Sequence, residues 1–324
     1  GRSEYSADLK NVMKKYDILD NINPAVLECV TYDDRVVAMP SKAAIMGLSY
    51  NVDLFEKAGL MEVDGTPKQP KDWNEVVEFA KQIKEKTGKP GIVLPTANRS
   101  GGWIFTSIAW SFGVNFMEQQ ADGKWKATFN TPEAAEALQW VKDLKWKYDL
   151  LPTNTLIDGQ EWYRVFGTGN AGMSIMAGDY PSRVVTYGMQ PEQVGIMATP
   201  AGPKAHVTLL TGEVHAVSSK ATEDQIDAAM RWIKTETTYE ASDEFKKNKE
   251  DSIKQDLEDG KLVGVKVFSP WKGDTPAVKY ERELIDKYSN ANPNHVRLYN
   301  EFVANCPIEI RAEEPMCCQE LYAT

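Results

Sequence analysis

Residues 40–60 read PSKAAIMGLSYNVDLFEKAGL, and the pattern changes from strand to helix in the middle of this stretch. Ile45 to Tyr50 is a short apolar run, which predicts a strand. Asn51 to Ala58 then has the pattern of a short helix. Gly59 ends this helix, because glycine readily adopts the left-handed conformation that closes a helix. A strand that leads directly into a helix is typical of an α/β protein.

Helical and strand-like segments continue to alternate on both sides of this stretch. Before it, Val36 to Met39 is predicted to be a short strand that ends at Pro40. After it, Asp72 with Glu75 and Thr131 with Pro132 are signals for helix starts. The remaining predicted strands are Gly91–Leu94, Met173–Met176, Val194–Ala198 and Glu213–Val217, and the remaining predicted helices are Glu161–Phe166, the segment after Thr222, Lys246–Lys261 as a solvated helix or linker, Glu281–Tyr288 and Val296–Val303.

The composition indicates a globular protein of two domains. The 324 residues include 47 acidic and 37 basic side chains, which give a formal net charge of -10. A nucleic-acid partner would need clustered Lys and Arg, so the acidic balance argues against one. Residues 1–10 are polar and lack the apolar core of a signal peptide. Residues 100–117 are uncharged but contain too many polar residues for a membrane span, and they are predicted to be a loop entering a buried helix.

The sequence contains none of the common catalytic motifs. GxSxG, the P-loop, HExxH and a helix-opening GxGxxG are all absent. The three histidines lack metal-ligand spacing, so we expect no metal and no cofactor. Cys29 and Cys306 would pair only if the fold brought them together, and the adjacent Cys317 and Cys318 are expected to be unpaired thiols.

Aromatic residues beside turn formers are the best candidates for ligand contact. They are Trp103, Trp162 with the adjacent Tyr163, Tyr180 and Trp271, and the alternative for each is ordinary packing. Trp140, Trp146 and Trp232 lie at helical spacing and are predicted to pack in the core. Aromatic rings stack on the apolar faces of sugars, and hydrogen bonds to hydroxyl groups complete such a site. The candidates for these hydrogen bonds are Asn98, Arg99, Asp179, Glu213 and Arg297.

Other functions remain open at this point. A carbohydrate hydrolase would use Asp179 and Glu213 as its pair of carboxyl groups. A receptor for an anion such as a polyol phosphate would need Arg99, Arg183 or Arg297 to converge on a helix N-terminus. A surface adhesion or scaffold protein would bury its aromatic residues and bind no small molecule.

Four segments, taken in order, resemble the family 1 extracellular solute-binding proteins, which are the maltose-binding-protein-like receptors of ABC importers. The first is residues 40–60, with YNVDLFEKAGL as its most similar part. The others are Pro70–Glu75 (PKDWNE), Phe166–Met173 (FGTGNAGM) and Thr211–Ser218 (TGEVHAVS). Their order and spacing agree with the family from about residue 32 to residue 232.

The resemblance implies a type II periplasmic-binding-protein fold, in which two hinge-joined α/β lobes enclose a ligand cleft. The N-terminal-type lobe would hold residues 1–50 and about 235–300, and the C-terminal-type lobe residues 51–234 and about 301–324. Trp103, Asp179 and Tyr180 match cleft segments of the family. Ala44 replaces a cleft glutamate of the maltose-specific members, which argues against maltose itself.

The same resemblance implies a partner and a location. The closed form would dock on ABC permease subunits, and the chain would act as a monomer. It would function outside the cytoplasm, in the periplasm or as a membrane-anchored lipoprotein. Members of the family begin with a βαβαβ unit before the first residue of this chain and end in a further helix. We therefore expect the chain to be trimmed at both ends.

Overall fold

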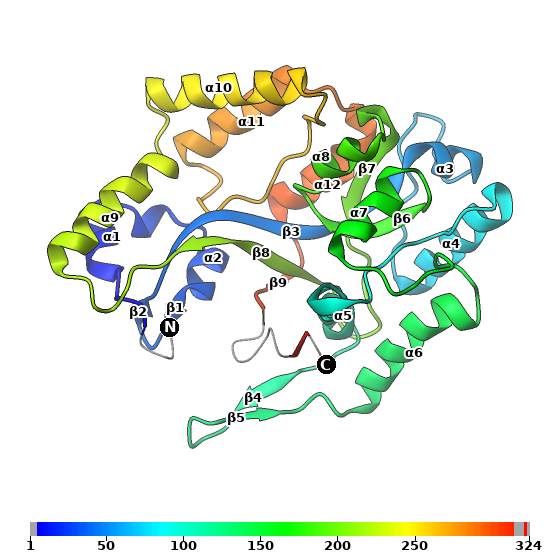
Figure 1. Cartoon of the computed structure of the whole chain (residues 1–324), viewed down its shortest axis with the longest axis horizontal. Coiled ribbons are helices and arrows are strands. Elements are labelled where there is room, and N and C mark those ends of the chain that lie inside the picture. The colour runs from blue at the N-terminus through cyan, green and yellow to red at the C-terminus, as the bar shows by residue number, and fades with distance from the viewer. Residues whose placement is uncertain (1–4, 314–320, 323–324) are drawn as a thin grey trace.

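Two long strands run through the middle of the molecule and connect two lobes (Figure 1). The computed structural model describes residues 5–313 and 321–322. The strands are β3 (Met39–Asn51) and β8 (Val207–His215), and they pair antiparallel over the first half of β3. This paired segment, residues 39–45 of β3 with residues 210–215 of β8, is called the bridge below.

The second half of β3, residues 46–51, is the middle of the sheet of the second lobe. β6 (Met173–Ala177) and β7 (Val194–Ala198) both pair antiparallel with it. Every residue of β6, β7 and this half of β3 is buried. A strand that is buried on both faces consists mainly of apolar or small residues, because neither face contacts water. This explains the continuous apolar runs in the sequence.

Helices cover this sheet. The elements of the second lobe besides β3, β6 and β7 are α3 (Val52–Lys57), α4 (Trp73–Thr87), α5 (Asn98–Ser111), the hairpin strands β4 (Met117–Gln119) and β5 (Trp125–Ala127), α6 (Pro132–Trp146), α7 (Gly159–Gly167), α8 (Pro181–Val184), η2 (Val185–Tyr187), η3 (Pro191–Gln193), α12 (Pro293–Asn305) and β9 (Glu309–Arg311), which is parallel to the start of β8.

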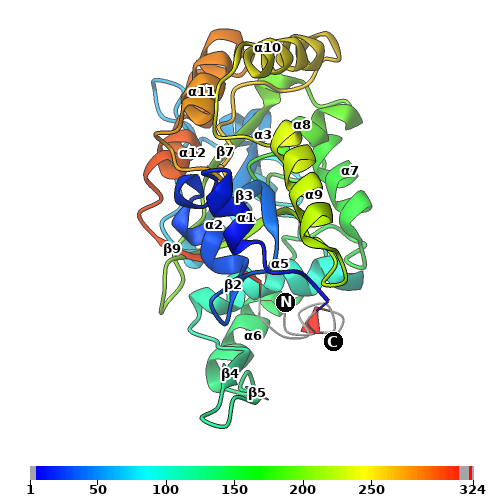
Figure 2. The same cartoon turned by 90° about the vertical axis from the view of Figure 1, so that its left-hand side faces the viewer.

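The first lobe is built mainly from helices. Its elements are α1 (Lys10–Lys15), η1 (Leu19–Asn21), α2 (Pro24–Cys29), the hairpin strands β1 (Thr31–Tyr32) and β2 (Arg35–Val36), α9 (Glu223–Glu236), α10 (Asp243–Glu258) and α11 (Pro276–Tyr288). Figure 2 shows α1 and α2 on the face that is at the left of Figure 1, with α10 and α11 above them. The predicted α/β fold of two lobes is confirmed.

The predicted helix starts are confirmed by their capping side chains. The Asn51 side chain accepts a hydrogen bond from the Leu54 amide at the start of α3. Asp72 accepts from two amides at the start of α4, and Thr131 accepts from the Ala134 amide in α6. Thr222 forms a full capping box at the start of α9. Each cap satisfies amide groups that the first turn of a helix leaves without partners.

Three strand predictions need correction. Pro40 does not end a strand, because β3 continues through it. The pairing register with β8 shifts between Pro40 and Lys42. Such an irregularity accommodates a residue that lacks an amide hydrogen. Residues 91–94 form no strand, and Ile92 makes only an isolated bridge to Met173. β8 ends at His215, before the predicted end at Val217.

The contacts of two helices bear on how the chain divides between the lobes. In α9, the Asp227 carboxylate accepts hydrogen bonds from Lys15 Nζ at 2.5 Å and from the Tyr16 hydroxyl at 2.9 Å. These contacts tie α9 to α1 in the first lobe. α12 packs along β7 in the second lobe. We therefore propose a lobe division in which residues 223–236 join the first lobe and residues 293–305 join the second.

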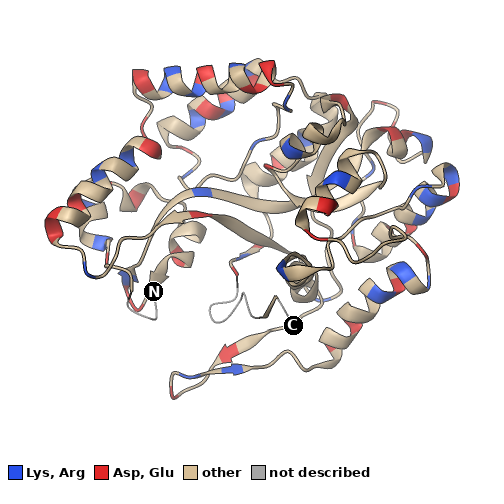
Figure 3. Ribbon diagram, in the orientation of Figure 1, with Lys and Arg blue, Asp and Glu red and all other residues tan. Residues whose placement is uncertain are grey.

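Charged side chains concentrate on the outer helices. Figure 3 shows them along α4, α6, α9 and α10, while the middle of the sheet is almost free of them. α10 is the extreme case, because it has no fully buried residue, as predicted for a solvated helix. Across residues 5–313 and 321–322, the structure contains no helix with the length and apolar character needed to cross a membrane.

Candidate functional site

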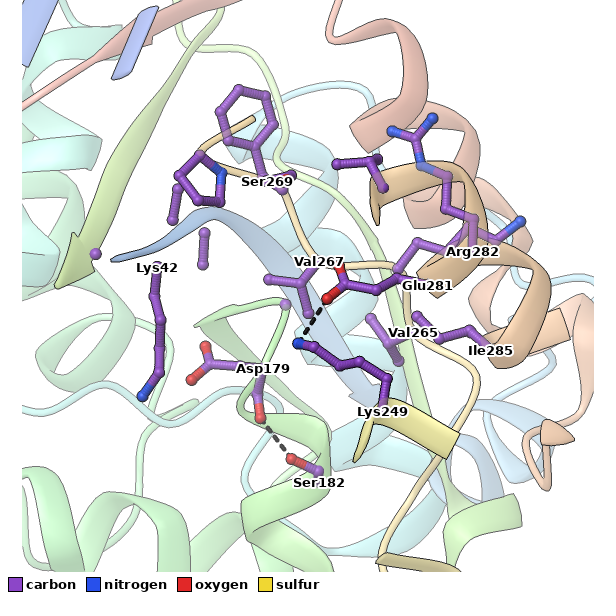
Figure 4. Close-up of a pocket in the computed structure, with 18 of the residues that line it drawn as sticks. Lys42, Asp179, Ser182, Lys249, Val265, Val267, Ser269, Glu281, Arg282 and Ile285 are labelled. Carbon is purple, nitrogen blue, oxygen red and sulfur yellow. Dashed lines mark hydrogen bonds and ion pairs between the residues drawn. The ribbon is translucent and has the colours of Figure 1, made fainter. Parts of the chain in front are cut away.

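A cavity of about 620 Å³ lies between the bridge and the helices above it (Figure 4). Its walls come from both lobes: the bridge, the turn after β6 at residues 178–183, the helices α10 and α11, and the loop at residues 262–271. This volume falls within the range of roughly 300–1,000 Å³ that is typical of small-molecule sites. A ligand in this cavity would contact residues of both lobes at once.

The turn after β6 is held in place by the core of the second lobe. A Cβ atom on Gly178 would lie 2.4 Å from the hydroxyl oxygen of Tyr299, so only glycine fits here. The Tyr299 hydroxyl donates a hydrogen bond to the carbonyl of Ile45 at 2.7 Å. Further along the turn, the Ser182 hydroxyl donates to the carbonyl of Asp179 at 2.7 Å. These contacts hold the backbone of the turn against the core of the second lobe.

Arg183 and Asp179 form an ion pair on this turn. Arg183 Nη2 lies 3.1 Å from Asp179 Oδ2, and the guanidinium lies 5.1 Å from the centre of the Tyr180 ring. This arrangement orders three side chains on one short segment. A paired guanidinium and carboxylate still offer unused donor and acceptor positions to a ligand.

Four aromatic rings form a cluster behind the turn. Tyr180 lies edge-on to Tyr163 and Trp162, with ring centroids 5.1 and 5.9 Å away, and Trp103 lies 6.5 Å away. Trp162 is 1% exposed, and its indole donates a hydrogen bond to the Ser174 hydroxyl. Burial raises the pKa of both tyrosine hydroxyls, so they are neutral hydrogen-bonding groups at neutral pH.

The bridge contributes a second ion pair to the cavity. Lys42 of β3 and Glu213 of β8 are cross-strand partners, and Lys42 Nζ lies 2.9 Å from Glu213 Oε2. Both side chains are largely exposed, so their contribution to stability is small. Their position matters more, because they place one cation and one anion on the floor of the cavity.

The first-lobe side of the cavity combines an apolar wall with a third ion pair. Lys249 of α10 forms an ion pair with Glu281 of α11, with Nζ and Oε1 2.6 Å apart. Figure 4 marks this pair with a dashed line. Phe268 and Trp271 are nearly buried in the loop that lines the cavity. The Trp271 ring lies edge-on to Tyr239, with centroids 5.6 Å apart. The site thus offers aromatic and aliphatic surface together with balanced charges.

Four of the nine predicted site residues line this cavity: Asp179, Tyr180, Glu213 and Trp271. Trp103 and Trp162 lie behind Tyr180 in the aromatic cluster. Trp103 is on α5 and not in a loop, because that helix already begins at Asn98.

The other three predicted residues lie away from this cavity. Asn98 and Arg99 are exposed in the first turn of α5 and do not line the cavity. Arg297 is on α12, where its guanidinium contacts Glu301 and Thr66. It lies away from the cavity because α12 packs along β7. Consequently Arg99, Arg183 and Arg297 do not converge.

Sequence reasoning missed Lys42, Lys249, Glu281 and Arg282, which all line the cavity. A lysine inside an otherwise apolar strand was a usable signal for Lys42. No comparable signal exists for the other three, because they lie in helices that are charged along most of their length.

The prediction about helical tryptophans was wrong for two of the three. Trp146 is 78% exposed and Trp232 is 57% exposed, whereas Trp140 packs partly against the core. Among the tryptophans beside turns, Trp162 and Trp271 are nearly buried. Helical spacing shows which residues share a face, but it does not show what covers that face.

The described part of the chain contains neither a disulfide bond nor a cluster of side chains placed to bind a metal ion. Cys29 and Cys306 are both free thiols, so the fold does not bring them together. Cys317 and Cys318 lie outside the described residues. Within residues 5–313 and 321–322, no group of three or more His, Cys, Asp and Glu is placed to hold a metal ion.

Comparison with known proteins identifies one family model. Residues 4–242 match the model described as bacterial extracellular solute-binding protein. Among curated proteins, a binding protein of Brucella abortus is 28% identical over 183 residues, which are 56% of this chain and 41% of that protein. The chain therefore spans less than half the length of this relative.

Solved structures agree on the fold. The maltose-bound MalE3 of T. maritima superposes with a TM-score of 0.65 at 22% identity and covers 99% of this chain and 79% of its own. An oligosaccharide periplasmic-binding protein of Synechococcus superposes with a TM-score of 0.70 at 17% identity and covers 99% and 74%. At these identities the likeness shows the two-lobed fold and nothing about the ligand.

Proposed function

We propose that this chain, which belongs to the bacterial extracellular solute-binding proteins, captures an oligosaccharide or another sugar in the cavity between its lobes. In this role it is the substrate-binding subunit of an ABC importer and delivers the sugar to permease subunits. The observation that carries the proposal is the composition of the cavity: Tyr180 and Trp271 stand among three ion pairs.

A sugar fits this combination of groups. Its C–H groups form apolar faces that can lie against aromatic rings, and its hydroxyl groups donate and accept hydrogen bonds in fixed directions. Asp179, Glu213 and Glu281 offer acceptors, while Lys42, Arg183 and Lys249 offer donors. Since each of these charges has a partner of opposite sign, a neutral ligand leaves no charge uncompensated.

Capture is proposed to proceed by closure of the lobes. The bridge is the natural hinge, because two strands can twist without losing the packing of either lobe. A ligand held by residues of both lobes stabilises the closed form, since it binds that form more tightly. The closed form then docks on the permease. We propose that the chain works as a monomer outside the cytoplasm, in the periplasm or anchored to the membrane as a lipoprotein.

The geometry gives less support to the other functions. The carboxylates of Asp179 and Glu213 both line the cavity, but each is paired with a cation of its own. A glycosidase needs two carboxyl groups that face the scissile bond, whereas here each carboxylate is engaged by its own cation. We propose capture without turnover. An anion receptor is disfavoured because the three arginines do not converge.

Isothermal titration with malto-oligosaccharides, xylo-oligosaccharides and arabino-oligosaccharides tests the proposal. We expect one panel to bind and Tyr180→Ala to lower its affinity about tenfold, as the loss of one aromatic contact and its hydrogen bond predicts. Gln139→Ala, on the exposed face of α6, serves as the control and should bind as the native chain does. The proposal is wrong if no glycan binds while inorganic or sugar phosphates do, or if the sugar is cleaved.

A further inference from the structure

A second cavity of about 490 Å³ adjoins the first, beyond the turn that carries Tyr180. It lies between α7, the segment from α8 to η2, and the C-terminal end of α10. The residues that line it are Gln160, Tyr163, Ser182, Arg183, Thr186, Tyr187, Asp256 and Lys261.

The two cavities meet at three shared residues. Ser182, Arg183 and Asp256 line both of them. Arg183 belongs to α8 in the second lobe, and Asp256 belongs to α10 in the first. The junction is therefore another place where the two lobes face each other, with a cation on one side and an anion on the other.

The charges around the second cavity already have partners. Lys261 Nζ lies 2.7 Å from Asp256 and 3.3 Å from Asp259, and Arg183 pairs with Asp179. An anionic or cationic ligand would have to break one of these pairs. A neutral ligand would only add hydrogen bonds to them, so the electrostatics favour a neutral polar occupant.

The lining groups suit hydroxyl groups and sugar rings. The wall contains two tyrosines, one amide, two aliphatic hydroxyls and the paired charges, and none of its lining residues is Val, Leu, Ile or Met. The first cavity differs, because Val265, Val267 and Ile285 are among its lining residues. Tyr163 links the two cavities. It lines the second cavity, and its ring contacts the ring of Tyr180, which lines the first.

We propose that the second cavity binds the outer units of an oligosaccharide whose other units occupy the first cavity beside Trp271. The inference rests on the proposed function and deepens it, because it makes a longer oligosaccharide the preferred ligand. Such a ligand passes between Arg183 and Asp256 and so contacts both lobes at the junction as well as in the first cavity.

The test is a titration series in ligand length. The probes are the members of the glycan panel that binds, from the disaccharide to the hexasaccharide. For the native chain we expect the affinity to rise with length and then level off. Gln160→Ala and Tyr187→Ala should lower the affinity for the longer probes about threefold to tenfold and leave the disaccharide unchanged. Gln139→Ala is the matched control, and thermal melting without ligand confirms that each variant folds.

The outcomes separate the two proposals. If the disaccharide and the hexasaccharide bind equally well, or if both variants weaken every length alike, the second cavity does not hold the outer units of the ligand, although the proposed function stands. If no sugar of any length binds to the native chain, the proposed function fails and this inference fails with it.

Discussion

The two halves of β3 are one continuous strand in two different surroundings. Residues 46–51 have a paired strand on each side and are buried throughout. Residues 39–45, in the bridge, pair with β8 and carry the exposed Lys42. The comparison teaches that one strand can be both a rigid anchor and a connector, depending on how many neighbours hold it.

The second half of β3, residues 46–51, is held by α12, a helix that lies far from it in the sequence but packs against it. The Tyr299 ring of α12 lies against Gly47, where an added Cβ atom would come within 2.7 Å of it. In the bridge, the corresponding side-chain contact is the exposed ion pair of Lys42 and Glu213. We therefore expect the loss of the buried Tyr299 contact to cost far more stability than the loss of the exposed Lys42–Glu213 ion pair.

The largest effect is expected for Tyr299→Ala. This change removes a ring that is completely buried, so the free energy of unfolding should fall by about 3–5 kcal/mol. Tyr299→Phe keeps the ring and loses only the hydrogen bond, which should cost about 1 kcal/mol. Urea unfolding followed by circular dichroism measures both values. A Tyr299→Ala variant as stable as the native chain would remove the distinction between the two halves.

A pH effect of intermediate size is expected from His295, in the first turn of α12. It is 6% exposed, its carbonyl accepts a hydrogen bond from Tyr50, and burial lowers the pKa of its imidazole. Hydrogen bonding to the carbonyl of Glu192 and the charge of Glu56 oppose this shift. The folded state therefore favours the neutral ring, and its Nδ1 has no hydrogen-bond partner among the described residues.

The sign of this effect follows from the lowered pKa. The stability that the neutral ring permits is fully present above the ordinary value of 6.5 and is lost as the pH falls from there through the folded pKa. Urea unfolding between about pH 7 and pH 5 should show this loss. His295→Gln should flatten the curve over that interval, and an unchanged slope would assign the effect to other groups.

The smallest effect is expected in the bridge. Lys42→Met should change the free energy of unfolding by less than about 1 kcal/mol, because both partners of its ion pair are exposed. A double-mutant cycle with Glu213→Gln measures the coupling directly. A coupling energy as large as the loss in Tyr299→Ala would mean that the bridge is held as firmly as the sheet.

Much of the fold could be predicted because local signals are strong where the chain starts a helix or crosses the core. The caps at Asn51, Asp72 and Thr131 and the apolar runs of β6 and β7 all depend on neighbouring residues alone. The passage of β3 through Pro40 could not be predicted in this way, because it depends on where β8 pairs.

The site was harder to predict because it is assembled from distant parts of the chain. Tyr180 and Asp179 were accessible to sequence reasoning, since they follow a glycine at a strand end. Lys249 enters the cavity because α10 packs on α11, and nothing in its neighbourhood marks it. Arg297 illustrates the opposite error, in which a suitable side chain lies on a helix that faces elsewhere.

The close approach of Gly178 to Tyr299 has a consequence for how new specificities can be engineered. The backbone of the turn after β6 is held by the close contact between Gly178 and the buried Tyr299 ring. A randomised library at positions 179, 180 and 183 can therefore explore new ligands on an unchanged scaffold. A library that includes position 178 would lose most of its members to misfolding before selection began.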